Sequence, residues 1–176
     1  MKKELFPANT IDSVDYDLNY MKSVVQFDWW ESKWKNYNDW FISDAIPKLK
    51  SLNISGTMIF TGVYTGEDYS LLKHEFPEMT FIGIDVYRYT DDDIIIADVR
   101  DYLPSMNVEI DIMWNGIGPW PWSRDSKQAC FDYAKKYLKS GGLYIDHVHT
   151  VKDAPHVIED ADFTLLDPSF IIMEKL

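Results

Sequence analysis

The sequence predicts an α/β fold built around a mostly parallel β-sheet, and two observations indicate it. First, three short apolar runs follow one another between Gly56 and Val99, at 56–62, 80–85 and 93–98. Continuous apolar runs of this length are typical of strands that are buried on both faces, as the strands of parallel sheets are. Second, helix-like segments alternate with the predicted strands, and this alternation favours right-handed βαβ units.

Composition and charge narrow the class of protein. The chain has 176 residues and a formal net charge of −12, so we expect one soluble domain and no nucleic-acid partner, because phosphate binding relies on clustered Lys and Arg. Cys130 is the single cysteine, which excludes an internal disulfide and indicates a reducing compartment. No apolar run resembles a signal peptide or a membrane span. We therefore expect a cytoplasmic protein with no membrane contact; no feature indicates its oligomeric state.

Residues 1–55 are expected to form an N-terminal arm and an aromatic helix that packs on the core. Residues 1–20 are polar and show little periodicity, which favours an extended arm. Apolar residues recur at helical spacing over 28–46, namely Trp30, Trp34, Tyr37, Phe41 and Ala45. Pro47, Asn53 and Gly56 are expected to end this helical region and lead into the first strand.

Residues 56–176 are expected to form the sheet and the remaining helices. Strands are predicted at 56–62, 80–86, 93–99, 109–114 and 143–148, and helices at 66–75, 123–139 and 152–160. Lys139-Ser-Gly-Gly142 is expected to end the helix at 123–139, because glycine commonly ends helices. The tail at 163–173 is expected to form two strands joined by an Asp-Pro turn. The sheet then has seven strands, of which the last two form an antiparallel hairpin.

Polar or small residues stand where the first three strands end. The first strand ends in Gly62, the second in Asp85 and the third in Asp98. In open α/β sheets, ligands bind outside the carboxyl ends of the strands. These residues are therefore expected beside a small molecule. The alternative is that the two aspartates only begin turns, as aspartate often does.

Four features of the chain from residue 56 onward resemble the class I S-adenosylmethionine-dependent methyltransferase family. Phe60-Thr-Gly-Val-Tyr-Thr-Gly66 stands where the family has an acidic-x-Gly-x-Gly-x-Gly loop, and Leu138-Lys-Ser-Gly-Gly142 resembles its Leu-Lys-Pro-Gly-Gly turn. Asp85, 23 residues past Gly62, stands where an acidic residue of the family holds the ribose hydroxyls. Asp98 matches the acidic residue beside the adenine amino group.

The resemblance implies a Rossmann-like three-layer sandwich that uses S-adenosylmethionine as its cofactor. The implied cofactor-binding residues are Gly62, Tyr64, Gly66, Asp85 and Asp98. A carboxylate accepts hydrogen bonds from two hydroxyls, and glycine lets the backbone approach a ligand closely. Two positions depart from the family: Phe60 replaces the acidic residue of the loop, and Tyr64 replaces its middle glycine. Tyr64 either folds over the cofactor or blocks it.

The loop after the strand at 109–114 stands where the family binds its methyl acceptor. Members that methylate amino groups often carry an Asn/Asp-Pro-Pro-aromatic loop there, and this chain has Asn115-Gly-Ile-Gly-Pro119-Trp120. Asn115 is therefore a candidate catalytic residue, and Trp120 and Trp122 are candidates for shaping the acceptor site. The alternative is a loop stiffened by prolines. An aromatic lid that includes Trp29 and Trp40 is the alternative to their packing in the core.

Three further residues have simpler interpretations. His147, which shares a strand face with His149, is a candidate general base. No third ligand follows this pair at a diagnostic spacing, so no metal site is predicted. Asp111 is interpreted as a carboxylate that bonds a neighbouring turn, and Cys130 as a buried helical residue.

These features together predict an S-adenosylmethionine-dependent methyltransferase that acts on a small-molecule or protein acceptor. One alternative is a methyltransferase-like binding or scaffold subunit without activity, which Phe60 and Tyr64 motivate. Another is a nucleic acid amino-methyltransferase. The Asn115–Trp120 loop motivates that second alternative, and the acidic net charge opposes it.

Overall fold

The computed structural model describes residues 39–63, 66–86, 93–117, 124–146, 160–167 and 171–176. The chain divides into two compact units, one formed by Pro7–Ile54 and one by Met1–Phe6 with Ser55–Leu176. The predicted packing of the N-terminal helix on the core stays a prediction. Within the described residues, no helix combines the length and the apolar character needed to cross a membrane.

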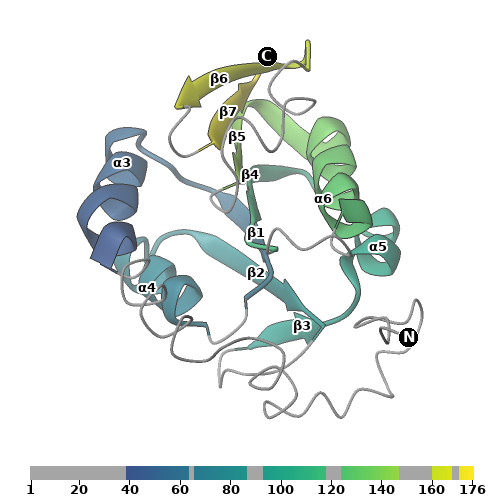
Figure 1. Ribbon diagram of the computed structural model, residues 1–176, viewed down its shortest axis with the longest axis horizontal. Helices are drawn as coiled ribbons and strands as arrows, with labels where there is room; N and C mark the ends of the chain where they lie inside the picture. The colour runs from purple at the N-terminus through teal and green to yellow at the C-terminus, as the bar shows by residue number, and fades with distance from the viewer. Residues whose placement is uncertain (1–38, 64–65, 87–92, 118–123, 147–159, 168–170) are drawn as a thin grey trace, which may run out of the picture. The chain divides into compact units, whose positions relative to one another are not determined.

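The larger unit contains a seven-stranded sheet in the order β3-β2-β1-β4-β5-β7-β6 (Figure 1). The strands are β1 (Thr57–Thr61), β2 (Thr80–Asp85), β3 (Ile94–Ile96), β4 (Ile110–Asn115), β5 (Leu138–Asp146), β6 (Phe163–Asp167) and β7 (Ile171–Lys175). Neighbours among β1–β5 are parallel, and β7 runs antiparallel to both β5 and β6. The predicted mostly parallel sheet with a C-terminal antiparallel hairpin is confirmed.

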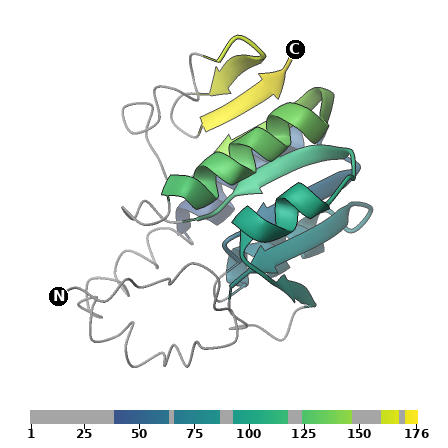
Figure 2. The same cartoon turned by 90° about the vertical axis from the view of Figure 1, so that its right-hand side faces the viewer.

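Helices cover both faces of this sheet (Figures 1 and 2). α4 (Glu67–Glu75) lies on one face, and α5 (Val99–Tyr102) and α6 (Arg124–Tyr137) lie on the other, with the 3₁₀ turn Leu103–Ser105 after α5. Alternation along β1 connects the layers. Phe60 packs edge-on against Tyr69 of α4, with ring centroids 5.4 Å apart, whereas the next residue, Thr61, contacts Cys130 of α6. The result is the three-layer arrangement that the family resemblance implies.

Phe60 is a core residue. Its ring is fully buried and stacks on Trp114, its register partner on β4, with centroids 5.3 Å apart and planes 11° apart. The position that is acidic in the resembling family is thus filled here by an aromatic packing contact.

Pro47 does not end the helical region of the smaller unit, which continues to Ser51, just before Asn53, so the expectation is wrong for Pro47. A π-helical turn, Phe41–Ala45, leads directly into α3 (Ile46–Ser51), which contains the proline in its first turn. A proline inside a helix lacks an N–H donor, and its ring crowds the carbonyl four residues earlier. In the π turn, the N–H of Ile46 donates to the carbonyl of Phe41, five residues earlier, which widens the helix just before the proline.

The expectation that Lys139-Ser-Gly-Gly142 caps α6 is also wrong. α6 ends at Tyr137, and Leu138 already pairs with Ile110 of β4, whereas the next register pair is Ile112 with Leu143. The glycines therefore lie in a bulge of β5. A Cβ atom on Gly142 would lie 2.8 Å from the carbonyl oxygen of Asp111, which explains why this position is glycine.

Asp111 connects that bulge to the start of β1, which confirms its interpretation as a turn-bonding carboxylate. Its Oδ2 accepts a hydrogen bond from Thr57 N at 2.8 Å, and its Oδ1 accepts one from Lys139 Nζ at 2.8 Å. Burial acts to raise the pKa of Asp111, but the bonds from Lys139 and Thr57 outweigh it and lower the pKa below its ordinary value.

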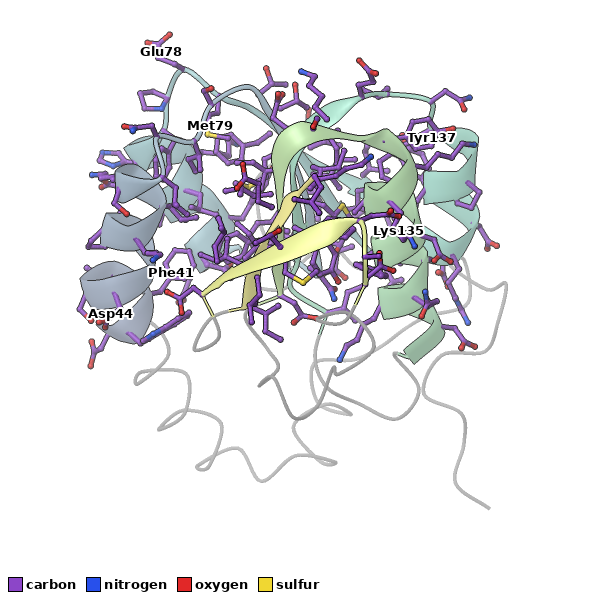
Figure 3. The ribbon with its side chains drawn as sticks, turned by 90° about the horizontal axis from the view of Figure 1, so that it is seen from above. Phe41, Asp44, Glu78, Met79, Lys135 and Tyr137 are labelled. Carbon is purple, nitrogen blue, oxygen red and sulfur yellow. The ribbon has the colours of Figure 1, made fainter. Side chains whose placement is uncertain are left out.

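The last strand is attached to the C-terminal turn of α6. Lys175 Nζ donates to the carbonyl oxygen of Lys135, in the last turn of α6, at 2.8 Å, and to that of Leu138, the first residue of β5, at 2.6 Å. Lys135 Nζ forms an ion pair with Asp160 at 2.8 Å (its position is labelled in Figure 3). The bonds from Lys175 hold β7 to the end of α6, and the ion pair holds the segment just before β6.

Candidate functional site

The carboxyl ends of β1 and β4 meet where the strand order reverses. The chain proceeds outward from β1 to β3 and then returns to β4, on the other side of β1. Ligands of open α/β sheets bind at such a switch point. The turn after β1 and the turn after β4 are in direct contact here, since Gly116 N donates to the carbonyl oxygen of Thr61 at 2.8 Å.

Gly62 allows this close contact. Its φ of 71° lies in the left-handed region, and a Cβ atom would be 2.7 Å from the carbonyl carbon of Gly116. Gly66, with a φ of 80°, is the residue before α4. Both glycines therefore occupy positions with a backbone requirement for glycine, as the predicted turn needs. Tyr64, between them, lies outside the described residues, and cofactor binding by this turn stays a prediction.

Asp85 and Asp98 stand at the ends of neighbouring strands. Asp85 is the half-buried last residue of β2, and its carbonyl oxygen accepts a hydrogen bond from Ala97 N at 2.9 Å. Asp98 comes directly after Ala97 and is the N-cap residue of α5. The structure thus brings together the two carboxylates that the sequence predicts at one edge.

Asp98 is held by Arg100. Asp98 Oδ1 accepts from the backbone N–H of Arg100 at 2.9 Å, and both carboxylate oxygens accept from the guanidinium of the same residue. Burial acts to raise the pKa of Asp98, but the bonds and charge of Arg100 outweigh it and lower the pKa. Asp98 thus makes the capping contact that the alternative interpretation expects, and its role beside an adenine stays a prediction.

A buried polar row crosses the ends of three parallel strands. Thr61 of β1 is in register with Asn115 of β4, and Asn115 is in register with Asp146 of β5. The exposed fractions of the three residues are 0%, 0% and 3%. Buried polar groups need hydrogen-bond partners, and the bonds within this row determine how its side chains are oriented.

The orientation of the Asn115 amide follows from its neighbours. One end of the amide lies 3.0 Å from Asp146 Oδ2 and 3.2 Å from the hydroxyl oxygen of Tyr144. Because a carboxylate only accepts, this end is Nδ2, and both of its hydrogens are used. Oδ1 then faces the turn after β4 and accepts from Ile117 N at 3.3 Å.

Two other ionisable side chains, those of Tyr144 and Cys130, contact this row. Burial, together with the negative charge of Asp146, raises the pKa of the Tyr144 hydroxyl well above its ordinary value. Cys130 lies 3.5 Å from Thr61 Oγ1, and burial raises the pKa of its thiol to about 12. The interpretation of Cys130 as a buried helical residue is confirmed. A thiol with this pKa is not a nucleophile near neutral pH.

Several predicted residues lie outside the described part of the chain. They are Tyr64, Trp120, Trp122, His147 and His149, together with Trp29 of the proposed lid. Among the described residues, no group of three or more His, Cys, Asp or Glu side chains is arranged to hold a metal ion.

Sequence reasoning did not assign Arg100 or Tyr144 to the site, and it placed Asp146 at the functional edge beside His147 without pairing it with Asn115. Arg100 was detectable in principle, because an arginine two residues after an N-cap aspartate can bond to it. Asp146 and Tyr144 depend on the register between β4 and β5, which no local pattern indicates.

Comparison with other proteins supports the fold assignment. No protein-family model matches the chain, and no curated protein matches it in sequence. Solved structures do match: a provisionally assigned caffeoyl-CoA O-methyltransferase from Staphylococcus aureus is 13% identical, with a TM-score of 0.57 over 92% of this chain and 100% of that one.

Two further structures show the same architecture. A provisionally assigned rRNA methylase from Clostridium thermocellum is 11% identical, with a TM-score of 0.56 over 77% of this chain and 95% of that one. DesVI from Streptomyces venezuelae is 13% identical, with a TM-score of 0.52 over 81% of this chain and 66% of that one. At such identities the likeness concerns architecture alone. The chain has the Rossmann-like fold of the class I S-adenosylmethionine-dependent methyltransferases.

Proposed function

We propose that this protein is an S-adenosylmethionine-dependent methyltransferase that acts on a small-molecule or protein acceptor. The observation that carries the proposal is the order of residues along the carboxyl edge of four consecutive strands. From β3 through β2 and β1 to β4, these residues are Asp98, Asp85, Gly62 and Asn115. Two carboxylates at one side and a tight glycine turn at the switch point are suited to a nucleoside that continues into an amino-acid tail.

The described residues fit such a cofactor. Asp85 would accept the two ribose hydroxyls, and Asp98 would accept from the adenine amino group. Gly62 and Gly66 would admit the methionine part beside the backbone, with Tyr64 closing over it. The acidic surroundings of this edge, in a chain with a net charge of −12, would favour a positively charged sulfonium.

The chemistry asks the protein mainly to position two groups. When bound, S-adenosylmethionine supplies a methyl group on a positively charged sulfur, which the acceptor atom displaces in line. We assign Asn115 to orient the acceptor through Oδ1, and Trp120 and Trp122 to pack against it. His147 would take the proton that the acceptor atom loses. Holding donor and acceptor together without water between them is the expected source of most of the acceleration.

Calorimetric titration with S-adenosylmethionine and S-adenosylhomocysteine tests this proposal. We expect both to bind, and Asp85→Asn to weaken binding about tenfold or more, because a charged acceptor of two hydroxyls is lost. Glu78→Gln removes one carboxylate from an exposed position just before β2, at the amino edge of the sheet, and is the matched control (Figure 3). No binding of either compound by the unmodified protein would overturn the proposal.

A binding or scaffold subunit without activity is the second candidate. The observation that favours it is the occupation of the Asp98 carboxylate by Arg100. Phe60, by contrast, no longer favours it, because its ring belongs to the core rather than to the strand edge. Cofactor binding without release of S-adenosylhomocysteine in the presence of small amines, phenols, catechols and protein extracts would support this candidate.

The remaining expectations belong to the same proposal. We propose a cytoplasmic location, which the single cysteine and its buried reduced thiol support. The net charge of −12 supports an acceptor other than nucleic acid. Fractionation of cells and a filter-binding measurement with RNA and DNA at physiological salt test these two points.

A further inference from the structure

Arg100 fills the hydrogen-bonding capacity of the carboxylate that the adenine amino group would use. Oδ1 of Asp98 accepts from the backbone N–H and from Nε of Arg100, each within 3.0 Å. Oδ2 accepts from Nε at 3.0 Å and from Nη2. A carboxylate oxygen offers about two lone-pair positions, so both oxygens of Asp98 are fully used within the chain.

An adenine amino group therefore cannot bond to Asp98 while the guanidinium remains in place. The backbone bond from Arg100 N to Oδ1 belongs to the cap of α5 and need not break. The three side-chain contacts are different, because they come from a flexible arginine that is not part of the helix cap. Their removal would expose three acceptor positions on Asp98 without unfolding α5.

We propose that Arg100 competes with the adenine amino group for Asp98 and thereby lowers the affinity of the protein for S-adenosylmethionine and S-adenosylhomocysteine. This inference rests on the function proposed above. The cofactor binds the form of the protein in which the guanidinium has left Asp98. The apparent dissociation constant is then the intrinsic constant divided by the fraction of molecules in that form.

The structure offers Arg100 a place to go. Its side chain is 28% exposed, against 12% for that of Asp98, so the guanidinium can turn toward solvent while the carboxylate stays covered. Asp101 on α5 and Asp125 in the first turn of α6 also attract the arginine. The displaced cation would therefore keep favourable charge neighbours, and the exchange on Asp98 would remain reversible.

Two substitutions at position 100 separate charge from geometry. Arg100→Gln removes both the charge and the planar fork, and Arg100→Lys keeps the charge but cannot form the two-pronged contact. We expect S-adenosylhomocysteine to bind Arg100→Gln about twofold to fivefold more tightly than the unmodified protein, which is the range for a partly exposed ion pair. Arg100→Lys should bind S-adenosylhomocysteine with an affinity between those of the unmodified protein and Arg100→Gln.

Lys135→Gln is the matched control. It removes another side-chain cation that forms an ion pair, with Asp160 and Asp162, at the C-terminal turn of α6 rather than at the strand ends. We expect this variant to bind S-adenosylhomocysteine with unchanged affinity. A general effect of net charge on binding would instead appear equally in Arg100→Gln and Lys135→Gln.

Nitrogen NMR of the arginine side chains gives a readout that a purely structural role of Arg100 would not change. The chain has three arginines, Arg88, Arg100 and Arg124, so the spectrum of Arg100→Gln assigns the Nε–H resonance of Arg100 by its disappearance. Saturation of the unmodified protein with S-adenosylhomocysteine should shift this resonance and accelerate its exchange with water. Both changes indicate that the guanidinium has left Asp98.

The outcomes distinguish this inference from the proposed function. Equal or weaker binding by Arg100→Gln, with binding by the unmodified protein intact, would overturn the competition and leave the methyltransferase proposal standing. Tighter binding by Arg100→Gln than by the unmodified protein, with Lys135→Gln unchanged, would support the competition. Failure of the unmodified protein and of both variants to bind would overturn both.

Discussion

The side-chain amide of Asn115 donates a hydrogen bond to Asp146 Oδ2 at 3.0 Å, and this bond joins the carboxyl ends of β4 and β5. Both residues are buried, so neither can exchange its partner for bulk water. The bond also fixes which amide atom faces the turn after β4. It therefore links the strand that would carry the acceptor loop to its neighbour.

Asn115→Asp should make the stability of the protein depend on pH. The substitution places two buried carboxyl groups about 3 Å apart, and they cannot both ionise, so their shared pKa rises above that of the unfolded chain. A raised pKa gives stability that is present below the unfolded pKa and is lost as the pH rises through the folded one. A rise of two units would cost about 2.7 kcal/mol at neutral pH.

Urea unfolding of Asn115→Asp at pH 4.5 and pH 8 measures this effect. Asn107→Asp introduces the same charge at an exposed asparagine that accepts a bond from Tyr137, and serves as the control. The prediction fails when both variants show the same difference in unfolding free energy between the two pH values.

Gly62→Ala should destabilise the fold more than Gly141→Ala does. Both glycines have left-handed φ angles, 71° and 79°, so both substitutions cost about 1–2 kcal/mol in backbone strain. A Cβ atom on Gly62 would also lie 2.7 Å from the backbone of Gly116, whereas one on Gly141 would meet Glu174 Oε1 only at 3.8 Å. The difference between the two unfolding free energies therefore isolates the close approach of the turns after β1 and β4. Equal losses would show that these turns separate at no cost.

Much of the fold is predictable from the sequence, for a definite physical reason. The runs at 56–62, 80–86 and 109–114 correspond to β1, β2 and β4 within about two residues, because a strand buried on both faces must be apolar throughout. The glycine turn and the two strand-end aspartates were predictable for a similar reason. Glycine at a tight turn and aspartate at the end of a strand are both favoured by local backbone geometry, although Gly62 is also required by its contact with Gly116.

Features that depend on contacts between distant segments were not predictable. The row of Thr61, Asn115 and Asp146 exists only through the register of three strands. The bulge at 139–142 is likewise defined by its opposition to Ile110 and Ile112 on β4. Phe60 had a local motif to compare with, but its burial against Trp114 is decided by the neighbouring strand. In each case the sequence supplies the residues and the sheet pairing supplies their role.

Removal of the Asp111 carboxylate should make the free energy of unfolding depend less on pH in the acid range. The pKa of Asp111 is lowered in the folded protein, so its contribution is present above the unfolded value of 3.8 and is lost as the pH falls through the folded one. Asp111→Ala should lose about 1–2 kcal/mol at pH 7, because the Thr57 N–H and the Lys139 ammonium lose their acceptor. The loss should shrink as the pH falls below 3.8. Glu78→Ala, at an exposed position, should leave the free energy of unfolding unchanged both at pH 7 and below pH 3.8. A constant loss between pH 7 and pH 3 would contradict the assigned role.

Cys130 should report global unfolding, because it is the single thiol and is fully buried. Burial raises its pKa to about 12, so very little thiolate exists at pH 8 in the folded protein, and access is closed as well. We expect iodoacetamide to leave the native protein unmodified over hours at pH 8 and to alkylate it rapidly in urea. The labelled fraction measured by mass spectrometry should follow the same urea midpoint as circular dichroism.

Thr61→Val, which removes the hydroxyl beside Cys130 Sγ but keeps the side-chain volume, should lower that urea midpoint and still leave the thiol protected in native buffer. Rapid labelling of the unmodified protein without urea would show that α6 opens locally over β1, and would contradict the prediction.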